Sequence, residues 1–348
     1  MNSLFVSVIL INYNGKPLLE RFLPSVANLN YSNYEVVVVD NASTDGSAEF
    51  IRNTYPNFKI VIADSNYGTA EGSNIGAREA RGEYLFFVSN DMEPDKNILN
   101  YLIEKIENDL AIGVTTCKML RITERSEKLD ILDSLGSDAD IFGFPTARGI
   151  NEVDNGQWDF PAEVFFSFGG ALLIKKDLYN RIGGYDEKFF TLVDDTDLCW
   201  RVHLLGLKVM VEPKAFLYHR VSATLGTIYG RSHKRFLSER NTLRMLLKNY
   251  STGYLFFILP LYFVLLFLEM IFFIVVGKPI IAKSVVNAIG WNFSNLKDTL
   301  RKRKLAQNLR KARDNEIWKL MQKRSSKVSF FFDFLKQPRA GHWKGYFG

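Results

Sequence analysis

The first 118 residues alternate between short apolar runs and stretches with helical periodicity, and this alternation restricts the possible folds more than any other feature. Apolar runs of strand length lie at Phe5–Ile11, Glu35–Val39, Lys59–Ala63 and Tyr84–Val88. Helical stretches lie between or after them, at Leu18–Val26, Gly68–Arg81 and Asp95–Glu107. This order predicts an α/β domain whose largely parallel sheet is covered by helices on both faces.

The chain beyond residue 118 is less regular. Residues 119–165 are polar and only weakly periodic, and a segment this long without regular structure indicates a function beyond connecting two elements. Strands are expected at Phe165–Ile174 and Leu207–Val211, and helices at Asp195–Leu205 and Arg235–Leu247.

Composition excludes several classes of protein. Of 348 residues, 47% are hydrophobic and 24% are charged, a balance that supports a packed core and excludes a mainly disordered chain. Cys117 and Cys199 are too few for a disulfide framework and form no CxxC pair, so we expect a reducing compartment. The first residues lack a basic region and a small-residue cleavage site, so no signal peptide is expected.

One 24-residue segment, Gly253–Val276, carries a single charge, Glu269, and eight Phe or Tyr residues. A helix of this length rises about 36 Å, enough to cross the ~30 Å hydrocarbon core of a bilayer. A buried core helix is the alternative, but soluble helices seldom stay apolar on every face for so long. Basic residues flank both sides, which favours a re-entrant or in-plane segment over a single crossing. We therefore expect membrane attachment, with the topology open.

Basic residues gather after this apolar segment. Residues 297–327 contain 12 Lys or Arg against three acids, whereas the whole chain has a formal net charge of +6, so the first 296 residues are net acidic. A basic segment of this kind favours binding to an anionic partner, either a membrane surface or nucleic acid. Its position favours the membrane surface, and no nucleic-acid partner is expected. The predicted division is an α/β domain at 1–250, a membrane-associated segment at 251–296 and a basic amphipathic tail at 297–348.

Polar residues at the ends of the first two strands form the first candidate site. Asn12 and Asn14 follow the first strand and Asp40 ends the second. Their carboxylate and amide groups can hydrogen-bond the edge of a nucleobase, although a turn with a helix cap explains the same residues. A dinucleotide site is disfavoured because the first strand–helix turn, NYNGKP, lacks the GxGxxG pattern.

Two further clusters follow the third and fourth strands. The loop Asn66-Tyr67-Gly68 leads into a helix with Asn74 and Gly76, and glycines at such a junction let the backbone approach a phosphate or sugar. Gly76 is explained equally well by helix–sheet packing. Ser89-Asn90-Asp91 follows a buried strand, where a carboxylate can hold a divalent cation; a strand-ending turn is the alternative.

Acidic and basic side chains complete the candidates. Asp194, Asp195 and Asp197 place three carboxylates within four residues, and helix capping accounts for only one or two of them. His219 can complete a metal site, although a lone histidine is more often structural. Arg240 can clamp a diphosphate or contact a lipid headgroup.

Six segments of the chain, taken in their order, resemble the motifs of a known protein family. They are VDNASTDGS, NYGTAEGSNIGAREARG, SNDMEP, FGGALLIKKDLYNRIGGYDEKFFTLVDDTDLCWR, PKAFLYHR and ERNTLRMLLKNY, within residues 5–250. This order closely resembles the family 2 glycosyltransferases, in particular their rhamnosyltransferase-like branch. The resemblance implies the GT-A fold, a Rossmann-like, mixed and mostly parallel sheet flanked by helices, and an inverting transfer from a nucleotide-sugar.

The resemblance also implies roles for single residues. Asp195 matches the catalytic base, with Asp194 where the family has Glu; Asp91 matches the last acid of the DxD-type metal motif, with Ser89 at its first position. His219 would complete a site for Mg²⁺ or Mn²⁺. The residues expected in donor binding are Asn12, Asn14, Asp40, Asn66, Gly68, Asn74, Asn90, Asp91 and Arg240, and those expected in acceptor binding are Phe168, Gly169, Gly170, Asp197 and Trp200.

These expectations describe an inverting glycosyltransferase at the cytoplasmic face of the cell membrane. Its donor is a nucleotide-sugar and its acceptor is a hydroxyl group of a lipid-linked or other glycan. Two alternatives stay open: a polyprenyl-phosphate glycosyltransferase, and a non-catalytic, membrane-docked nucleotide-sugar-binding protein. The first uses an anionic acceptor that hardly needs a base, so the Asp-Asp-x-Asp element disfavours it.

Overall fold

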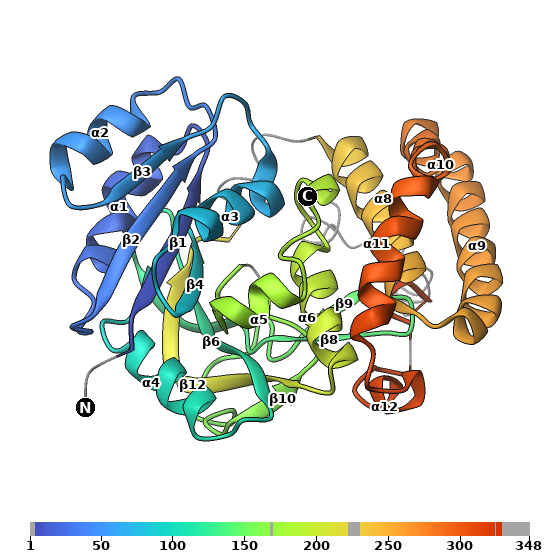
Figure 1. Cartoon of the computed structure of the whole chain (residues 1–348). Coiled ribbons are helices and arrows are strands. Elements are labelled where there is room, and N and C mark those ends of the chain that lie inside the picture. Colours follow the sequence, from blue (N-terminus) through green and yellow to red (C-terminus); the bar gives the residue numbers. More distant parts are fainter. Residues whose placement is uncertain (1–3, 168–169, 222–229, 324, 329–348) are drawn as a thin grey trace. The chain divides into compact units, whose positions relative to one another are not determined.

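The computed structural model describes residues 4–167, 170–221, 230–323 and 325–328 (Figure 1). It divides into two compact units, one of residues 1–137 with 147–223 and one of residues 138–146 with 224–348. This division differs from the predicted boundary at residue 250. Helix α8 (Arg231–Asn249) belongs to the second unit because it packs against α10 (Pro279–Ser294) and α11 (Leu296–Leu309).

A mixed sheet forms the centre of the first unit. Its order is β10–β12–β6–β11–β4–β1–β2–β3, with β5 paired to β12 and β7 to β6. The strands are β1 (Val6–Asn12), β2 (Tyr34–Asp40), β3 (Lys59–Ile62), β4 (Tyr84–Ser89), β5 (Met92–Pro94), β6 (Ile112–Ile122), β7 (Lys128–Ser134), β10 (Ala162–Val164), β11 (Leu172–Lys175) and β12 (Lys208–His219). The pairs β1–β2, β1–β4, β2–β3 and β6–β12 are parallel, whereas β11 runs antiparallel to β4 and β6. The predicted mixed sheet is therefore confirmed.

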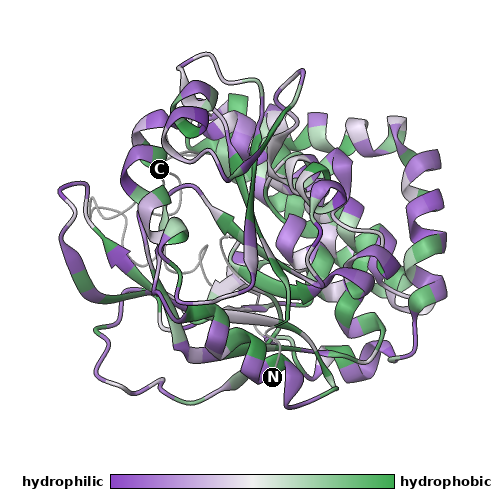
Figure 2. Ribbon diagram, turned by 60° about the vertical axis from the view of Figure 1, so that its left-hand side comes forward, coloured by the Kyte–Doolittle hydropathy of each residue, from purple (hydrophilic) through white to green (hydrophobic). Residues whose placement is uncertain are grey.

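Helices cover both faces of this sheet. On one face, α1 (Lys16–Ala27), α2 (Ser47–Thr54) and α4 (Ile98–Glu107) bury their apolar side chains against alternate residues of β1, β2 and β4. On the other face lie α3 (Gly68–Glu79), α5 (Lys176–Arg181) and α6 (Asp194–Leu204). Figure 2 shows hydrophilic and hydrophobic residues alternating along the helices. Strands of continuous apolar residues are what this two-sided burial requires.

Gly76 illustrates why α3 is rich in glycine. A Cβ atom at this position would lie 2.4 Å from the side chain of Ile9, so only glycine lets the helix approach the sheet this closely. The packing explanation considered for Gly76 in the sequence therefore matches the structure.

The segment after residue 118 contains more strand than its sequence indicates. It forms β7, β10 and the short pair β8 (Ser137–Ala139) and β9 (Pro145–Ala147). The expected strand Phe165–Ile174 is interrupted: β10 ends at Val164 and β11 begins at Leu172. Gly170, with a φ of +74°, lies in this interruption, and a left-handed residue does not continue a strand.

The second unit is mainly helical. It contains α8, α9 (Thr252–Val275), α10, α11 and the short α12 (Asp314–Trp318). Helix α9 coincides with the predicted apolar segment. Among the described residues, it is the one helix long and apolar enough to cross a membrane.

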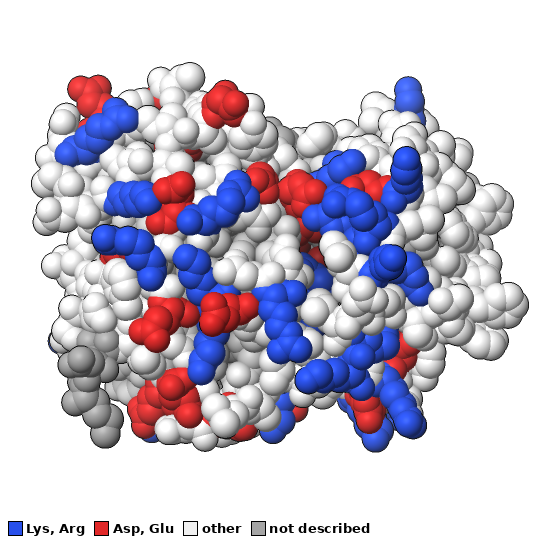
Figure 3. Space-filling model, viewed as in Figure 1, with Lys and Arg blue, Asp and Glu red and all other residues white. Residues whose placement is uncertain are grey.

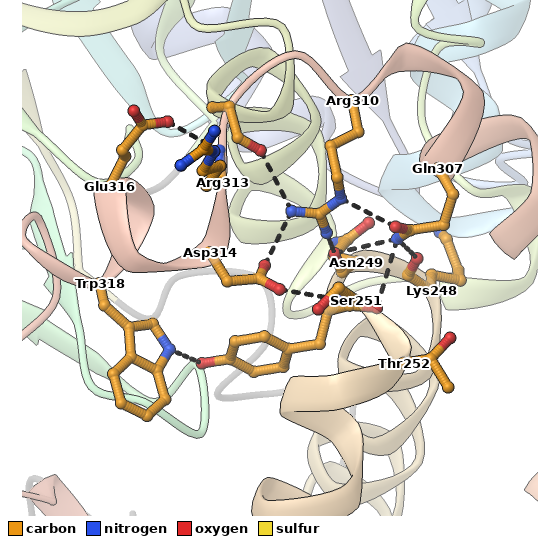
Figure 4. Close-up of polar contacts among 12 residues, drawn as sticks. Lys248, Asn249, Ser251, Thr252, Gln307, Arg310, Arg313, Asp314, Glu316 and Trp318 are labelled. Carbon is orange, nitrogen blue, oxygen red and sulfur yellow. Dashed lines mark hydrogen bonds and ion pairs between the residues drawn. The ribbon is translucent and has the colours of Figure 1, made fainter.

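The basic segment that follows α10 is partly engaged inside this unit. Gln307 donates to the carbonyl oxygens of Lys248 and Asn249 at 2.9 and 3.1 Å, and Arg310 donates to Asn249 O and pairs with Asp314 at 2.8 Å (Figure 4). The last carbonyl groups of a helix have no intrahelical partner, so these side chains cap α8. Part of the positive charge predicted to face an anionic surface therefore stabilises a helix end.

Candidate functional site

The carboxyl ends of β1, β2 and β4 carry a connected set of polar side chains. Asn12 donates from Nδ2 to Asp40 Oδ2 at 3.0 Å and accepts at Oδ1 from Asn90 Nδ2 at 2.9 Å. Asp40 also accepts from the backbone of Ser43 at 2.8 Å. All three predicted residues are buried. Asn12 thus holds Asp40 and Asn90 in fixed orientations at this edge of the sheet.

The other predicted donor residues of this edge organise loops. Asn14 accepts at Oδ1 from the backbone of Thr44 at 2.8 Å, and Asn66 accepts from the backbone of Gly68 at 2.9 Å. Asn74 accepts at Oδ1 from the hydroxyl of Tyr179 at 2.7 Å and donates to Tyr185 O at 3.0 Å, so it ties α3 to the loop after α5. Asn74 also donates to Glu71 Oε2 at 2.8 Å and accepts from the backbone of Tyr185 at 2.9 Å, so its amide is fully occupied.

Asp91 and His219 lie together just beyond β4 and at the end of β12. His219 Nε2 is 3.8 Å from Asp91 Oδ2, which is longer than a hydrogen bond. On the other side of the ring, Nδ1 lies 2.7 Å from Asp133 Oδ2 and donates to it, because a carboxylate can only accept. Burial disfavours the imidazolium, but the hydrogen bond to Asp133 and the negative charges of Asp133 and Asp91 outweigh it and raise the pKa of His219 to about 10.

This arrangement suits a divalent cation, which would replace the proton on His219 Nε2, because an imidazole binds a metal only in its neutral form. Metal-binding histidines commonly donate their second ring nitrogen to a carboxylate, as His219 does to Asp133. Among the described residues, no group of three or more His, Cys, Asp or Glu could hold a metal ion by itself. Asp91 and His219 therefore supply two ligands at most, and the remaining positions suit water and substrate phosphates, as is usual for Mg²⁺. Asp133 is a residue that the sequence analysis missed.

Asp195 lies at the first turn of α6 and accepts two hydrogen bonds. The backbone of Gly170 donates to Oδ2 at 3.0 Å, and the hydroxyl of Tyr185 donates to Oδ1 at 3.0 Å. Burial and the neighbouring Asp194 carboxylate disfavour its ionised form and raise the pKa of Asp195 to about 8. A carboxylate with a raised pKa at a sheet edge is poised to take up a proton.

Asp194 is held from the opposite side by α3. Its Oδ2 accepts from Thr69 Oγ1 at 2.8 Å, and burial raises the pKa of Asp194. The loop before it is strained: Phe190, Leu192 and Val193 have φ angles of 66°, 69° and 66°, which non-glycine residues rarely adopt. Such strain persists only where the surroundings enforce it, and it concentrates at functional sites.

Gly68 and Gly170 bring these elements together. A Cβ atom on Gly68 would lie 2.2 Å from Phe190 O, so glycine is required for the strained loop to lie on the start of α3. Gly170 lies beside Ser89, because its added Cβ would be 3.2 Å from Ser89 Oγ. Since β11 pairs antiparallel with β4, its first residues lie at the carboxyl end of β4. Asp40, Asp91 and Asp195 therefore line one edge of the sheet.

Three residues that were predicted to contact the acceptor or the donor make contacts within the protein instead. Asp197 is fully buried and pairs with Arg201 at 2.9 Å, and Trp200 is fully buried edge-to-face against Phe165. This geometry favours packing functions over acceptor contact. Arg240 belongs to the second unit, where its guanidinium lies 4.6 Å above the ring of Trp291. Phe168 and Gly169 lie outside the described residues.

Comparison with known proteins identifies the family of this chain. The family model described as glycosyl transferase family 2 matches residues 7–181. The chain is 26% identical over 231 residues to a poly-β-1,6-N-acetyl-D-glucosamine synthase of Staphylococcus epidermidis and 25% identical over 231 residues to one of Staphylococcus aureus. Each match covers 64% of this chain and 52% of the relative, so the chain spans about half the length of the curated relatives it matches.

Solved structures share the fold. GalNAc-T7 with UDP, GalNAc and Mn²⁺ matches with a TM-score of 0.54 and 18% identity, over 70% of this chain and 48% of that chain. The mannosyltransferase PcManGT from Pyrobaculum calidifontis, in complex with GDP-Man and Mn²⁺, matches with a TM-score of 0.51 and 18% identity, over 98% of this chain and 89% of that chain. At these identities the likeness establishes the fold, and it confirms the predicted GT-A architecture.

Proposed function

Since the chain belongs to glycosyl transferase family 2, we propose that it transfers a sugar from a nucleotide-sugar to a hydroxyl group of a glycan, with inversion at the anomeric carbon. The observation that carries this proposal is the environment of Asp195, which combines a raised pKa with two fixed hydrogen bonds at the ligand-binding edge of the sheet. A binding protein without activity has no need for a carboxylate poised in this way.

In the proposed reaction, Asp195 accepts the proton of the acceptor hydroxyl as its oxygen attacks the anomeric carbon. Gly170 and Tyr185 hold the carboxylate in position through their hydrogen bonds. The transition state resembles an oxocarbenium ion, so the carboxylates of Asp195 and Asp194 also stabilise its positive charge. Bond breaking leaves a nucleoside diphosphate, whose new negative charge requires compensation.

Asp91 and His219 are the proposed ligands of a divalent cation, Mg²⁺ or Mn²⁺. The donor set of one carboxylate and one imidazole fits such an ion, and the presence of Mn²⁺ in the two solved structures supports it. When bound, the ion would act as a Lewis acid toward the departing diphosphate. Asp133 would fix the ring of His219 for this purpose, and Asp40 with Asn12 and Asn90 would form the nucleoside side of the site.

The proposed acceptor is a growing or lipid-linked glycan at the cytoplasmic face of the cell membrane. The similar staphylococcal proteins are named for synthesis of a polysaccharide, which supports a glycan acceptor. The apolar helix α9 supports a membrane location. Transfer onto polyprenyl phosphate is the less favoured reaction, because an anionic acceptor does not require the base that Asp195 provides.

A donor screen tests this function. The purified full-length chain is heated with UDP-, GDP- or dTDP-sugars, with and without Mn²⁺, and the melting temperature is recorded. A ligand bound only by the folded state raises the apparent stability by mass action, about 2.7 kcal/mol at 100 times its Kd. We expect one nucleotide series to stabilise the protein, with a larger effect when Mn²⁺ is present. No stabilisation by any series would contradict the proposal.

The pH dependence of transfer provides a second test. Because only the ionised Asp195 can accept a proton, we expect kcat/KM to rise about tenfold per pH unit on the acid side and to level off near the Asp195 pKa of about 8. The substitution Asp194→Asn removes the neighbouring negative charge and preserves an acceptor for Thr69. The midpoint of the pH profile of kcat/KM should therefore move to lower pH. Asp177→Asn, on the exposed face of α5, is the matched control and should leave the midpoint unchanged. A midpoint that is the same in Asp194→Asn and the wild type would argue against this assignment.

The positioning function of Asp133 can be measured by metal binding. We expect Asp133→Ala to weaken Mn²⁺ binding about 10- to 100-fold in the presence of a nucleoside diphosphate, because the His219 ring loses its partner. Asp133→Asn retains an acceptor oxygen and should recover most of the affinity. Arg121, 3.4 Å from Asp133, offers a control: Arg121→Gln should bind Mn²⁺ normally. Equal Mn²⁺ affinities for the Asp133→Ala and wild-type proteins in calorimetry would remove Asp133 from this function.

A further inference from the structure

Helix α9 presents one continuous apolar side to its surroundings. The exposed large side chains follow each other at spacings of one to four residues and lie on one side of the helix: Phe256, Phe257, Leu261, Phe263, Val264, Phe267, Leu268, Ile271, Ile274 and Val275. Glu269, its single charge, faces the other side, where it pairs with Arg235 and, at 3.0 Å, with Lys327. From Phe256 onward, the exposed positions of α9 therefore carry apolar residues alone.

The opposite side of α9 lies against charged residues that are paired within the unit. Tyr262 donates its hydroxyl to Glu239 Oε2 at 2.7 Å, and the ring of Phe273 lies 5.8 Å from the guanidinium of Arg235. Burial favours a neutral Glu239, but the charges of Arg235 and Lys327 dominate and lower its pKa to about 2. Immersing α9 completely would carry this charge cluster into hydrocarbon, which is strongly unfavourable.

The helices before and after α9 contact each other, which is incompatible with a single crossing. On α10, Trp291 stacks under Arg240 of α8 at 4.6 Å, and Asn292 donates to Arg240 O at 2.9 Å. On α11, Thr299 accepts from Arg244 of α8 at 2.7 Å. A single crossing by α9 would place α10 and α11 on the opposite side of the membrane from α8. All three helices therefore lie on the same side.

A hairpin of two crossings is also disfavoured. Helix α10 has 16 residues and rises about 24 Å, less than the ~30 Å hydrocarbon core. It also carries the exposed Lys283 and the buried Asn292 that bonds to α8. A helix with these contacts cannot serve as the returning crossing without losing them.

Positive charge lies on the helices that follow α9. Lys278 and Lys283 are exposed at the start of α10, and Lys297 and Lys304 are exposed on α11 beside the apolar Leu300. Figure 3 shows Lys and Arg gathered over α11 and α12, whereas the surface over α9 carries other residues. Exposed lysines near a bilayer are attracted to anionic headgroups.

From these observations we infer that α9 lies in the plane of an anionic membrane, with its apolar side among the acyl chains and its other side on α8 and α10. The chain is then anchored from one side, without a crossing. This inference goes beyond the proposed function and does not depend on it, because a chain without transferase activity would bind vesicles in the same way.

Vesicle flotation tests the contact. We expect the full-length protein to float with phosphatidylglycerol/phosphatidylcholine vesicles and to bind pure phosphatidylcholine at least ~5-fold more weakly. The double substitution Val264→Asp/Leu268→Asp places charges on two half-exposed positions and should reduce binding at least ~10-fold. Leu110→Asp, at an equally apolar but 85% exposed position of the first unit, is the matched control and should bind normally. Absence of flotation, or equal binding by the double variant, would overturn the inference.

Depth measurement separates the in-plane arrangement from a crossing. A fluorescent label is attached to single cysteines at Phe257, Val264 and Val275 and quenched by lipids with spin labels at known depths; the unmodified chain, with Cys117 and Cys199 buried, gives the background. In-plane burial predicts equal depths for the three positions, about 5–10 Å into the boundary. In a crossing helix, Phe257 and Val275 would lie about 27 Å apart along the membrane normal, each near one surface. Val264 would then lie at least ~10 Å deeper than either of them. That result would contradict the in-plane arrangement.

Discussion

Replacement of Asp195 by asparagine is expected to lower kcat at least ~100-fold while the donor still binds. Asparagine has nearly the same shape and retains an oxygen that can accept from the backbone of Gly170. It cannot take up the proton of the acceptor hydroxyl. The loss therefore falls on the chemical step, and the affinity for the nucleotide-sugar should change little.

The same substitution should stabilise the fold. Since burial and Asp194 raise the pKa of Asp195 from 3.8 to about 8, the folded state holds a proton that the unfolded state releases. Its contribution to stability therefore falls as the pH rises from about 4 to 8. Asp195→Asn removes this dependence, so its melting temperature should exceed that of the wild type most clearly above pH 8.

Steady-state transfer, donor affinity and thermal melting give the required comparison. Asp177→Asn controls for the loss of one exposed carboxylate of the first unit and should resemble the wild type in all three. Near-wild-type turnover in Asp195→Asn would exclude Asp195 as the base. A loss of turnover together with a loss of melting temperature would indicate a structural function instead.

The sheet and the edge that carries the site could be predicted because both follow from local patterns. The run Val36–Val39 can only be a strand buried on both faces, and it ends at Asp40. Parallel strands end at the same edge, so Asn12, Asp40 and Asp91 had to gather there once the strands were identified.

The partners of these residues could not be predicted, because they depend on pairings between distant segments. Asp133 lies 86 residues from His219, on a strand in the weakly periodic region, and the two meet only through the pairing of β6 with both β7 and β12. Nothing in the sequence around Asp133 distinguishes it from other acids of that region. Tyr185 is similar: its contact with Asp195 depends on the strained loop before α6.

The charge pattern of the sequence showed where charged residues cluster, but it did not show which neighbours their side chains contact in the fold. Three acids at 194–197 suggested one chemical cluster, yet Asp194 and Asp195 face α3 and Gly170, whereas Asp197 lies beneath them in an ion pair with the buried Arg201. One helical turn separates these environments. Likewise, Arg310 and Lys327 belong to the basic segment but contact the carbonyl groups of α8 and the acid Glu239.

Replacement of Asp91 by alanine should abolish most of the metal-dependent donor binding. We expect the affinity for Mn²⁺ in the presence of a nucleoside diphosphate to fall at least ~100-fold. Asp133 lies at Nδ1 of His219, and among the described residues Asp91 is the only carboxylate at Nε2, the ring nitrogen that is left for a metal. His219 alone is a weak site. Isothermal titration with Mn²⁺, and donor titration with and without Mn²⁺, measure the two losses.

Asp40→Asn separates the metal from the nucleoside side of the site. Asp40 contacts Asn12 and Ser43 rather than His219, so its substitution should weaken donor binding by the same factor with and without Mn²⁺. Asp91→Ala should instead remove the difference that Mn²⁺ makes. If the two variants respond to Mn²⁺ in the same way, the cation is not held at Asp91, and another group must compensate the charge of the diphosphate.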